Sequence, residues 1–444
     1  MTWKAWKAYY KQLDWSRKWF PIFVLLRPIT DNFYKLKEVS TLLSPIYIMG
    51  VLTPVLAIAS LTSKKRTRNP ATADDTMKLW GIFTVINCIM MCLFFFSIDL
   101  FGNCIKYITP IVMYFYLRNY IRSKEDLHFI LTTFLFSAIF PFFMMFFEII
   151  FGSINPEYAS VGRGGGERIR GEYADSMNYA IYLTGSFLVY SYFFLHDIYN
   201  KNKKVKKQTS TIKLGIVFVM CLVAAISLRH VATWGVFLMI IALLLFYNSQ
   251  NLKGIIFVIF IAAIILPFFA RPIYDKQIYP LVAKEYNVMN GDQDVQYAFN
   301  GRVSRWERYF EIWDEMPPIA HFIGVSFSGD KIATVMTGGG MHNDYIRNLF
   351  ISGIIGVFFY ILSFILLLLR RPSVKAPERF LLTASVLIVM MYSMTTLPTI
   401  YPGLFCLVYP VYAFALLPKR QAYNIPVRTK LPFLAVPEPN TVPQ

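Results

Sequence analysis

Long apolar runs recur along the whole chain and alternate with short polar segments. Each run has about 16–25 residues, the length that an α-helix needs to cross the hydrocarbon core of a bilayer. The pattern predicts an all-α polytopic membrane protein with about twelve transmembrane helices, forming one integral-membrane domain over residues 1–444. The predicted spans are 17–34, 41–62, 79–98, 102–118, 127–151, 176–196, 211–228, 232–247, 254–270, 343–369, 380–396 and 401–417.

The lysine-rich clusters indicate which ends of these spans face the cytoplasm. With the N-terminus inside, every such cluster falls on the inner side, where Lys and Arg are enriched. Both chain ends, including the tail 418–444, are then cytoplasmic. The clusters are 63–68, 118–124, 201–207, 370–379 and 418–423.

The net charge of +18 would by itself suggest a nucleic-acid partner. Its distribution argues against one, because positive-inside sorting already accounts for the lysine excess. A composition of 56% hydrophobic and 16% charged residues also fits the membrane class, since soluble domains are nearer a quarter charged. The five cysteines all lie in or beside apolar runs, which favours neither a disulfide framework nor a zinc site.

Two substantial loops are predicted on the external side. One is 152–175, "GSINPEYASVGRGGGERIRGEYAD", and the other is 271–342. The cations in and near these loops are mostly arginines, although positive-inside sorting should deplete both basic residue types there. The planar guanidinium suits bidentate binding of a diphosphate or a carboxylate. The long loop is therefore expected to be functional.

The segment 300–318 within the long loop is predicted to form a short amphipathic helix at the membrane surface. Arg302 and Arg305 would then lie at headgroup depth, where a lipid-linked phosphate is found. Alternatively, these arginines bind lipid headgroups or pair with Glu307 and Glu311. The apolar face has helical spacing and consists of Trp306, Tyr309, Phe310 and Trp313.

Two further arginine positions stand out. "RGGGERIRGEYADSMNYA" at 163–180 is rich in glycine, which permits close backbone approach to a ligand; a flexible exterior loop is the simpler alternative. Arg229 lies in the tight hairpin predicted between 211–228 and 232–247, where a charge is expensive unless it faces a cavity or a partner. The neighbouring His230 is interpreted more simply as a hydrogen-bonded interfacial histidine.

His342 follows the triple glycine 338–340 and opens a span. Imidazole is the usual proton acceptor for a hydroxyl near neutral pH, so His342 is a candidate base; a capping or interfacial role is the alternative. The simplest role for Asp344 is to complement the dipole of the helix that begins there. The histidines are scattered without ligand spacing, so we expect neither a metal ion nor another cofactor.

Together these motifs resemble the O-antigen ligase and O-antigen or exopolysaccharide polymerase superfamily. Its "GR…W" motif is similar to Gly301-Arg302…Trp306, and its "H-N/S-x-x-L/I" motif is similar to His342-Asn343-Asp344-Tyr345-Ile346. A family arginine in a short turn resembles Arg229, with one extra residue inserted before it. The family region "R-x-G-x-F-x-x-x-N-x-x-A" resembles 170–180, with Gly171 one place early.

The resemblance implies a GT-C-like, metal-independent, inverting glycosyltransferase. Its donor would be a glycan on undecaprenyl diphosphate, used at the outer side of the bacterial cytoplasmic (inner) membrane. His342 would deprotonate the acceptor hydroxyl, while Arg302 and Arg229 would stabilise the leaving diphosphate. The expected supporting residues for substrate binding are Arg305, Arg170, Arg168, Asp344 and Glu172.

The acceptor remains open between two classes. A polymerase, which we favour, would use a second lipid-linked repeat unit, and a ligase would use lipid A-core. Membrane lipids and a chain-length regulator protein are further expected partners. A transporter or flippase of an anionic lipid-linked substrate would also explain the spans and arginines, but it should show internal repeats and broken helices. A non-catalytic scaffold would leave Arg229 unexplained.

Overall fold

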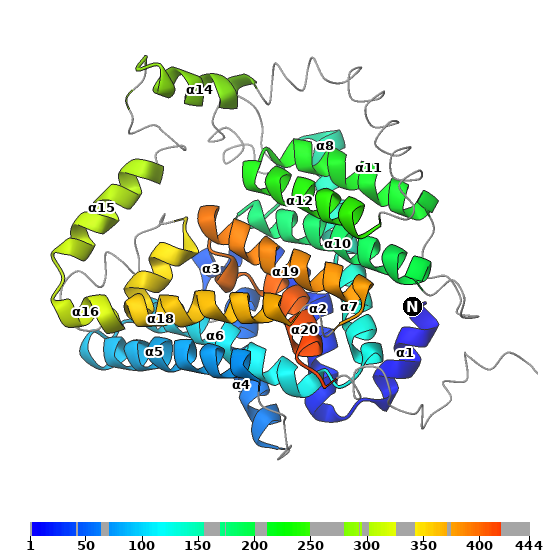
Figure 1. Ribbon diagram of the computed structural model, residues 1–444, viewed down its shortest axis with the longest axis horizontal. Helices are drawn as coiled ribbons and strands as arrows, with labels where there is room; N and C mark the ends of the chain where they lie inside the picture. The colour runs from blue at the N-terminus through cyan, green and yellow to red at the C-terminus, as the bar shows by residue number, and fades with distance from the viewer. Residues whose placement is uncertain are drawn as a thin grey trace, which may run out of the picture.

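The protein is all-helical in this computed structural model, and no strand occurs in the part of the chain that it describes (Figure 1). The predicted fold class is thereby confirmed at the level of an all-α protein. The described residues are 2–40, 43–63, 71–154, 169–173, 175–199, 211–248, 279–292, 294, 302–325, 342–370 and 374–418.

Most predicted spans correspond to one helix each. The span at 127–151 is instead two consecutive helices that meet at Ala138, and the span at 254–270 lies outside the described residues. The helices are α1 (Trp3–Gln12), α2 (Trp15–Asn32), α3 (Leu36–Val39), α4 (Pro45–Thr62), α5 (Thr72–Phe94), α6 (Ile98–Tyr120), α7 (Lys124–Ser137), α8 (Ile139–Phe151), α10 (Met177–Tyr199), α11 (Thr211–Leu228), α12 (Val231–Tyr247), α14 (Tyr279–Met289), α15 (Arg302–Asp314), α16 (Pro318–Ile323), α18 (Asp344–Leu369), α19 (Ala376–Thr395), the 3₁₀ turn η7 (Pro398–Ile400) and α20 (Pro402–Ala415).

Within the described residues, six helical segments are long and apolar enough to cross a membrane, so the chain is a membrane protein. They are α4, α5, the joined run α7–α8, α11, α18 and α19. Helices α12 and α20 are apolar but shorter. Among the remaining long helices, α2 carries Arg17, Lys18, Arg27 and Asp31 within 18 residues, which explains why its apolar character is weak.

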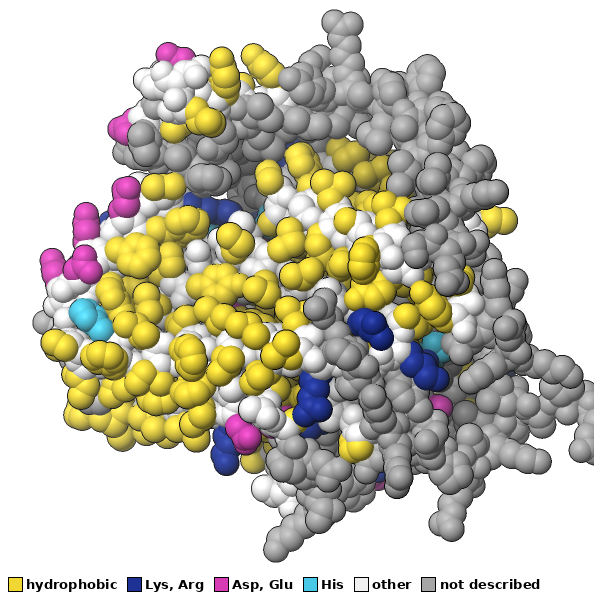
Figure 2. Space-filling view, viewed as in Figure 1, with side chains coloured by type: hydrophobic (Ala, Val, Ile, Leu, Met, Phe, Trp, Pro, Cys, Tyr) yellow, Lys and Arg dark blue, Asp and Glu magenta, His cyan; other side chains and the backbone are white. Residues whose placement is uncertain are grey.

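The bundle has an interior helix layer and an apolar exterior. Helix α10 is buried almost all round, as are α19 and α20, and each packs on several neighbours. Helices α4, α5 and α11 expose large aliphatic side chains such as Val55, Ile86 and Ile216. Figure 2 shows one such face, with hydrophobic side chains covering the region of α5, α16 and α18. An apolar exterior of this extent is what a lipid environment requires.

The two ends of the bundle differ. At one end, here the loop end, α5 and α19 finish, α6 and α18 begin, and the loop helices α15 and α16 lie against them (Figure 1). At the other, the N-terminal end, α1 packs against α7 through a hydrogen bond from Trp6 Nε1 to Thr133 Oγ1 of 2.7 Å. Helices α10 and α12 also finish at this end, where Tyr199 donates to the carbonyl of Tyr247 at 3.0 Å. Because α11 runs antiparallel to both, its turn into α12 lies at the loop end.

Helix α18 is not a single straight span as the apolar run predicted. It is broken at Gly353, whose φ of 67° is a left-handed conformation, and Figure 1 shows the bend. A side chain there would collide with the backbone of Phe322, so α16 is seated directly in the bend. Asn87 of α5 donates to the carbonyl of Ile323 and, at 2.9 Å, to that of Phe83. Helix α16 is therefore attached to the long apolar helices α5 and α18 by close backbone packing and a polar side chain.

The predicted helix at 300–318 exists as α15, and three of its four predicted apolar residues face inward. Trp313 is buried, and Trp306 and Tyr309 pack with it on a cluster formed by α5, α6 and α18. Tyr309 and Trp313 both make edge contacts with Phe350, with ring centroids 5.9 and 5.3 Å apart. Only Phe310 remains largely exposed. The expected membrane-surface contact is thus wrong for these three side chains, because the apolar stripe is satisfied by protein.

Candidate functional site

Two non-glycine residues in the described parts of the chain have positive φ. They are Arg229, with φ 49°, and His342, with φ 42°. Residues with a side chain rarely adopt this conformation, and it persists only where the surrounding structure enforces it. Both residues were candidates from sequence, and both lie at the loop end.

His342 directly precedes a well-capped helix. Asn343 is the N-cap of α18, and its side-chain oxygen accepts from the backbone N–H groups of Tyr345 and Ile346 at 3.0 and 3.1 Å. This satisfies two of the donors that a helix start leaves without partners. The N-cap is therefore Asn343, and neither His342 nor Asp344 is needed for that role. His342 itself is half-buried.

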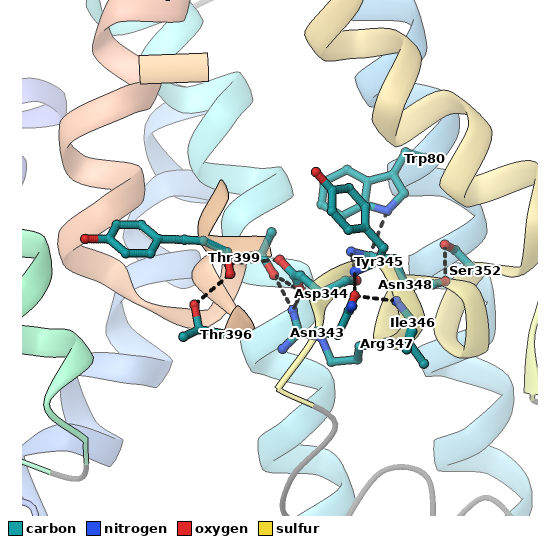
Figure 3. A network of polar contacts seen from close by, with 11 residues as sticks. Trp80, Asn343, Asp344, Tyr345, Ile346, Arg347, Asn348, Ser352, Thr396 and Thr399 are labelled. Carbon is teal, nitrogen blue, oxygen red and sulfur yellow. Dashed lines mark hydrogen bonds and ion pairs between the residues drawn. The ribbon is translucent and has the colours of Figure 1, made fainter. Parts of the chain in front are cut away.

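Asp344 and Arg347 form a buried ion pair one turn into the helix (Figure 3). Asp344 is 0% exposed and Arg347 is 4% exposed. Thr399, from η7, donates to Asp344 through its backbone N–H at 3.2 Å and through its hydroxyl at 3.0 Å. Arg347 also donates to the Thr399 hydroxyl oxygen. Asp344 is thus not merely a helix-dipole charge; it is the centre of a polar network that joins α18 to η7.

The neighbouring residues attach the same short segment to three further helices. Asn348 accepts from Trp80 Nε1 of α5 at 3.3 Å, and Tyr345 donates to the carbonyl of Met390 of α19 at 3.1 Å. The Arg347 guanidinium lies 5.0 Å from the ring centroid of Tyr107 of α6, a cation–π contact. Every polar side chain over 343–348 therefore has a tertiary or capping role, which makes the segment after His342 a rigid platform.

The segment 169–173 is positioned by residues from distant helices. Glu148, buried at the end of α8, accepts from the backbone N–H of Gly171 at 2.8 Å and from the Tyr179 hydroxyl at 3.2 Å. A side chain at position 171, where φ is 61°, would meet that hydroxyl. Asn32 accepts from the backbone N–H of Glu172 at 3.2 Å.

The side chains of this segment also extend toward neighbouring elements. Glu172 pairs with Lys35 at 3.3 Å, with both groups partly exposed, so its contribution to stability is small. Tyr401, next to η7, donates to Asp175 at 3.1 Å. The linker between α19 and α20 therefore contacts both the start of α18 and the start of α10. Arg170 is half-buried, and Arg168 lies outside the described residues.

The hairpin predicted around Arg229 is confirmed, since α11 ends at Leu228 and α12 begins at Val231. His230 is the N-cap of α12: its Nδ1 accepts from the backbone N–H of Thr233 at 3.3 Å. The hydrogen-bonded role expected for His230 is thus confirmed. Trp234 Nε1 donates to the carbonyl of Ala225 at 2.6 Å and holds the hairpin closed. Burial lowers the pKa of the Arg229 guanidinium from its ordinary value, although arginine stays charged at neutral pH.

The arginines of α15 lie on another element of the same end. Arg302 is the first residue of the helix and is half-buried, whereas Arg305 is exposed. The described sequence candidates therefore lie toward one end of the bundle (Figure 1), on four separate elements: α15, the turn between α11 and α12, the segment 169–173 and the start of α18. Gly301 and the triple glycine 338–340 lie outside the described residues.

Several site residues were missed from sequence. Arg347 was given no role, and Thr399, Tyr401 and Glu148 were not singled out. An Asp and an Arg three residues apart at the start of an apolar run do share a helix face, and that spacing could have revealed the pair. Nothing local marks Thr399, which is 55 residues from Asp344 in the chain.

No three His, Cys, Asp or Glu side chains come together as metal ligands within the described ranges. Comparison with protein-family models finds no match to this sequence, and comparison with curated proteins finds none either.

Proposed function

We propose that the protein is an integral-membrane glycosyltransferase that acts at the loop end of the bundle. The donor would be a glycan on undecaprenyl diphosphate, and the acceptor would be a second lipid-linked repeat unit. In this proposal the loop end faces the exterior of a bacterial cytoplasmic membrane, and the chain has twelve spans in a GT-C-like arrangement. The family resemblance of the motifs around Arg302 and His342 motivates the assignment.

The observation that carries the proposal is the strained backbone of His342 on a rigid platform. Strain of this kind, of order 1–3 kcal/mol per residue, is concentrated at functional sites. The same strained conformation occurs at Arg229, which the sequence also indicated for the reaction. A histidine that served only as a cap would not need it, because Asn343 already caps the helix.

The proposed chemistry is a single displacement. The acceptor oxygen forms a bond to the anomeric carbon while the bond from that carbon to the diphosphate oxygen breaks. The acceptor proton passes to the His342 imidazole. The diphosphate leaves with an additional negative charge, which fixed arginines such as Arg302 and Arg229 would stabilise.

Incubation of the purified protein with a lipid-linked repeat unit tests the proposal and its acceptor class. A ladder of longer glycans without any lipid A-core means polymerase activity, and His342→Ala should abolish it. Transfer only after lipid A-core is added would replace polymerase by ligase. Failure of both reactions with all lipid-linked donors offered would contradict the proposal.

Orientation is tested separately with reporters. A cysteine at position 290, beyond α14, should be labelled by a membrane-impermeant reagent from outside, and one at position 375, before α19, should not. The reverse result would place the loop end in the cytoplasm and remove the site from the exterior.

A flippase is the second candidate, and one observation favours it. Helix α18 is broken and carries a buried ion pair close to the break, as discontinuous helices of transporters do. Movement of an intact fluorescent lipid diphosphate across proteoliposomes, without a new glycosidic bond, would select this candidate over the transferase.

A further inference from the structure

The linker between α19 and α20 connects several elements of the loop end through hydrogen bonds. It includes η7, is only 396–401, and contacts two segments that are distant in sequence. Thr399 donates twice to Asp344 at the start of α18, and Tyr401 donates to Asp175 before α10. Figure 3 shows Thr399 beside Asp344, with their dashed contacts joining the two elements.

The Thr399–Asp344 contact resembles the hydrogen bonds that orient a catalytic group without touching the substrate. Asp344 accepts three hydrogen bonds with good partners, two from Thr399 and one from Arg347. Its backbone carbonyl accepts from Asn348 Nδ2 at 2.8 Å. His342 lies two residues before Asp344 and has a left-handed φ. The direction of its imidazole therefore depends on the position of the first turn of α18. A fixed helix start therefore fixes the histidine backbone.

We propose that Thr399 is a positioning residue for His342. Through its two hydrogen bonds to Asp344, it holds the first turn of α18 in the place from which the strained His342 addresses the acceptor hydroxyl. The inference rests on the proposed function for the role of His342. A displacement of about 1 Å caused by a residue that does not touch the substrate can lower activity by about 100-fold.

Two variants of Thr399 separate positioning from folding. Thr399→Val has nearly the same shape but loses the hydroxyl, while Thr399→Ser keeps it. The control is Thr53→Val, since Thr53 is also buried and its hydroxyl donates to a carbonyl of its own helix in α4. In glycan transfer, Thr399→Val should lower kcat by about 10–100-fold with KM for the donor nearly unchanged. Thr399→Ser and Thr53→Val should remain within about twofold of wild type.

A second measurement needs no turnover. Carbethoxylation of His342 by diethyl pyrocarbonate, followed by mass spectrometry, reports how the imidazole is presented. Thr399→Val should change that rate severalfold, whereas Thr53→Val should leave it unchanged.

These outcomes separate the inference from the proposed function. If wild-type protein transfers no glycan but Thr399→Val still changes the His342 modification rate, the positioning stands and the transferase proposal falls. If wild type is active and Thr399→Val matches it in kcat and in modification rate, the positioning is wrong. An equal loss in Thr53→Val, or no rescue by Thr399→Ser, would reduce Thr399 to a structural residue and overturn the inference.

Discussion

Among the buried aspartate–arginine pairs of the described residues, Asp74–Arg118 and Asp344–Arg347 lie at opposite ends of the bundle and are built differently. At the N-terminal end, Arg118 grips Asp74 with two hydrogen bonds, from Nε at 2.7 Å and from a terminal nitrogen at 2.8 Å. Tyr114 donates to the same carboxylate at 2.9 Å. The remaining terminal nitrogen of Arg118 donates to the carbonyl of Ala413 at 3.3 Å. This pair connects three helices and is well satisfied.

The loop-end pair is less complete and lies among irregular backbone. A single terminal nitrogen of Arg347 serves both Asp344 and Thr399, and within the described ranges its Nε has no hydrogen-bond partner. A left-handed His342 precedes it and the Gly353 break follows it. Burying a charge pair is costly either way. One pair therefore joins three helices, while the other fixes the first turn of α18 next to His342.

The largest expected effect tests whether the loop end is the reactive end. His342→Ala should lower transfer by about 10²–10⁴-fold, because the acceptor hydroxyl loses its base. Donor binding should stay close to normal, and the residual rate should lose the acidic limb that protonation of an imidazole base imposes. Kinetics across pH and a donor-binding assay provide the measurement.

His342→Gln sharpens this result, since glutamine can hydrogen-bond the acceptor but cannot take its proton. Near-normal turnover in the glutamine variant would make His342 a binding residue, with Asp344 and Glu172 next as candidate bases.

The substitutions Arg302→Lys and Arg118→Lys test one arginine at each end of the bundle. Lysine keeps the charge but loses the two-pronged donor geometry. Arg302→Lys should lose about 2–4 kcal/mol of transition-state stabilisation with little change in thermal stability. Arg118→Lys should show the opposite pattern. Steady-state kinetics and thermal melts measure both, and normal turnover with Arg302→Lys would reduce Arg302 to a lipid headgroup contact.

Neutralising each aspartate tests the two pairs directly. Asp74→Asn and Asp344→Asn each break a buried pair, and each should destabilise the protein, by as much as about 3–5 kcal/mol. Only Asp344→Asn should also reduce kcat of the protein that remains folded, by about tenfold or more. Equal turnover per folded molecule in the two variants would show that the Asp344 pair has no more influence on catalysis than the Asp74 pair.

Chelation of metal ions is expected to have no effect on glycan transfer. If fixed arginines stabilise the leaving diphosphate, transfer should survive treatment with chelators. Loss of activity on chelation, with rescue by a divalent cation, would show that the loop-end arginines do not suffice.

The two ends also differ in how well sequence predicts them. Helix positions followed from the apolar runs because burial in lipid or in protein selects the same residues. The hairpin at Arg229 and helix α15 were correct for the same reason. The break at Gly353 was not foreseen, since a glycine within an apolar run does not by itself indicate a left-handed conformation. The conformation of His342 was equally hidden.

Long-range contacts explain the remaining failures. Thr399 and Asp344 are 55 residues apart in the chain, and Glu148 and Gly171 are 23 residues apart. The sequence supports a proposal for which side chains carry the chemistry. It could not identify the side chains that orient them, because those belong to distant elements.

Asn87 adds a consequence for how substrates reach the site. Its amide is inside the bundle and supplies the partner for the last carbonyl of α16. Lifting α16 away would break that hydrogen bond, which contributes about 0.5–1.5 kcal/mol, while Asn87 would keep its bond to the Phe83 carbonyl at 2.9 Å. Close packing at Gly324 and Gly353 would be lost as well. Helix α16 should therefore remain attached to α5 and α18. We expect a bulky lipid-linked glycan to approach past the exposed side of α15 rather than between α16 and the helices on which it packs.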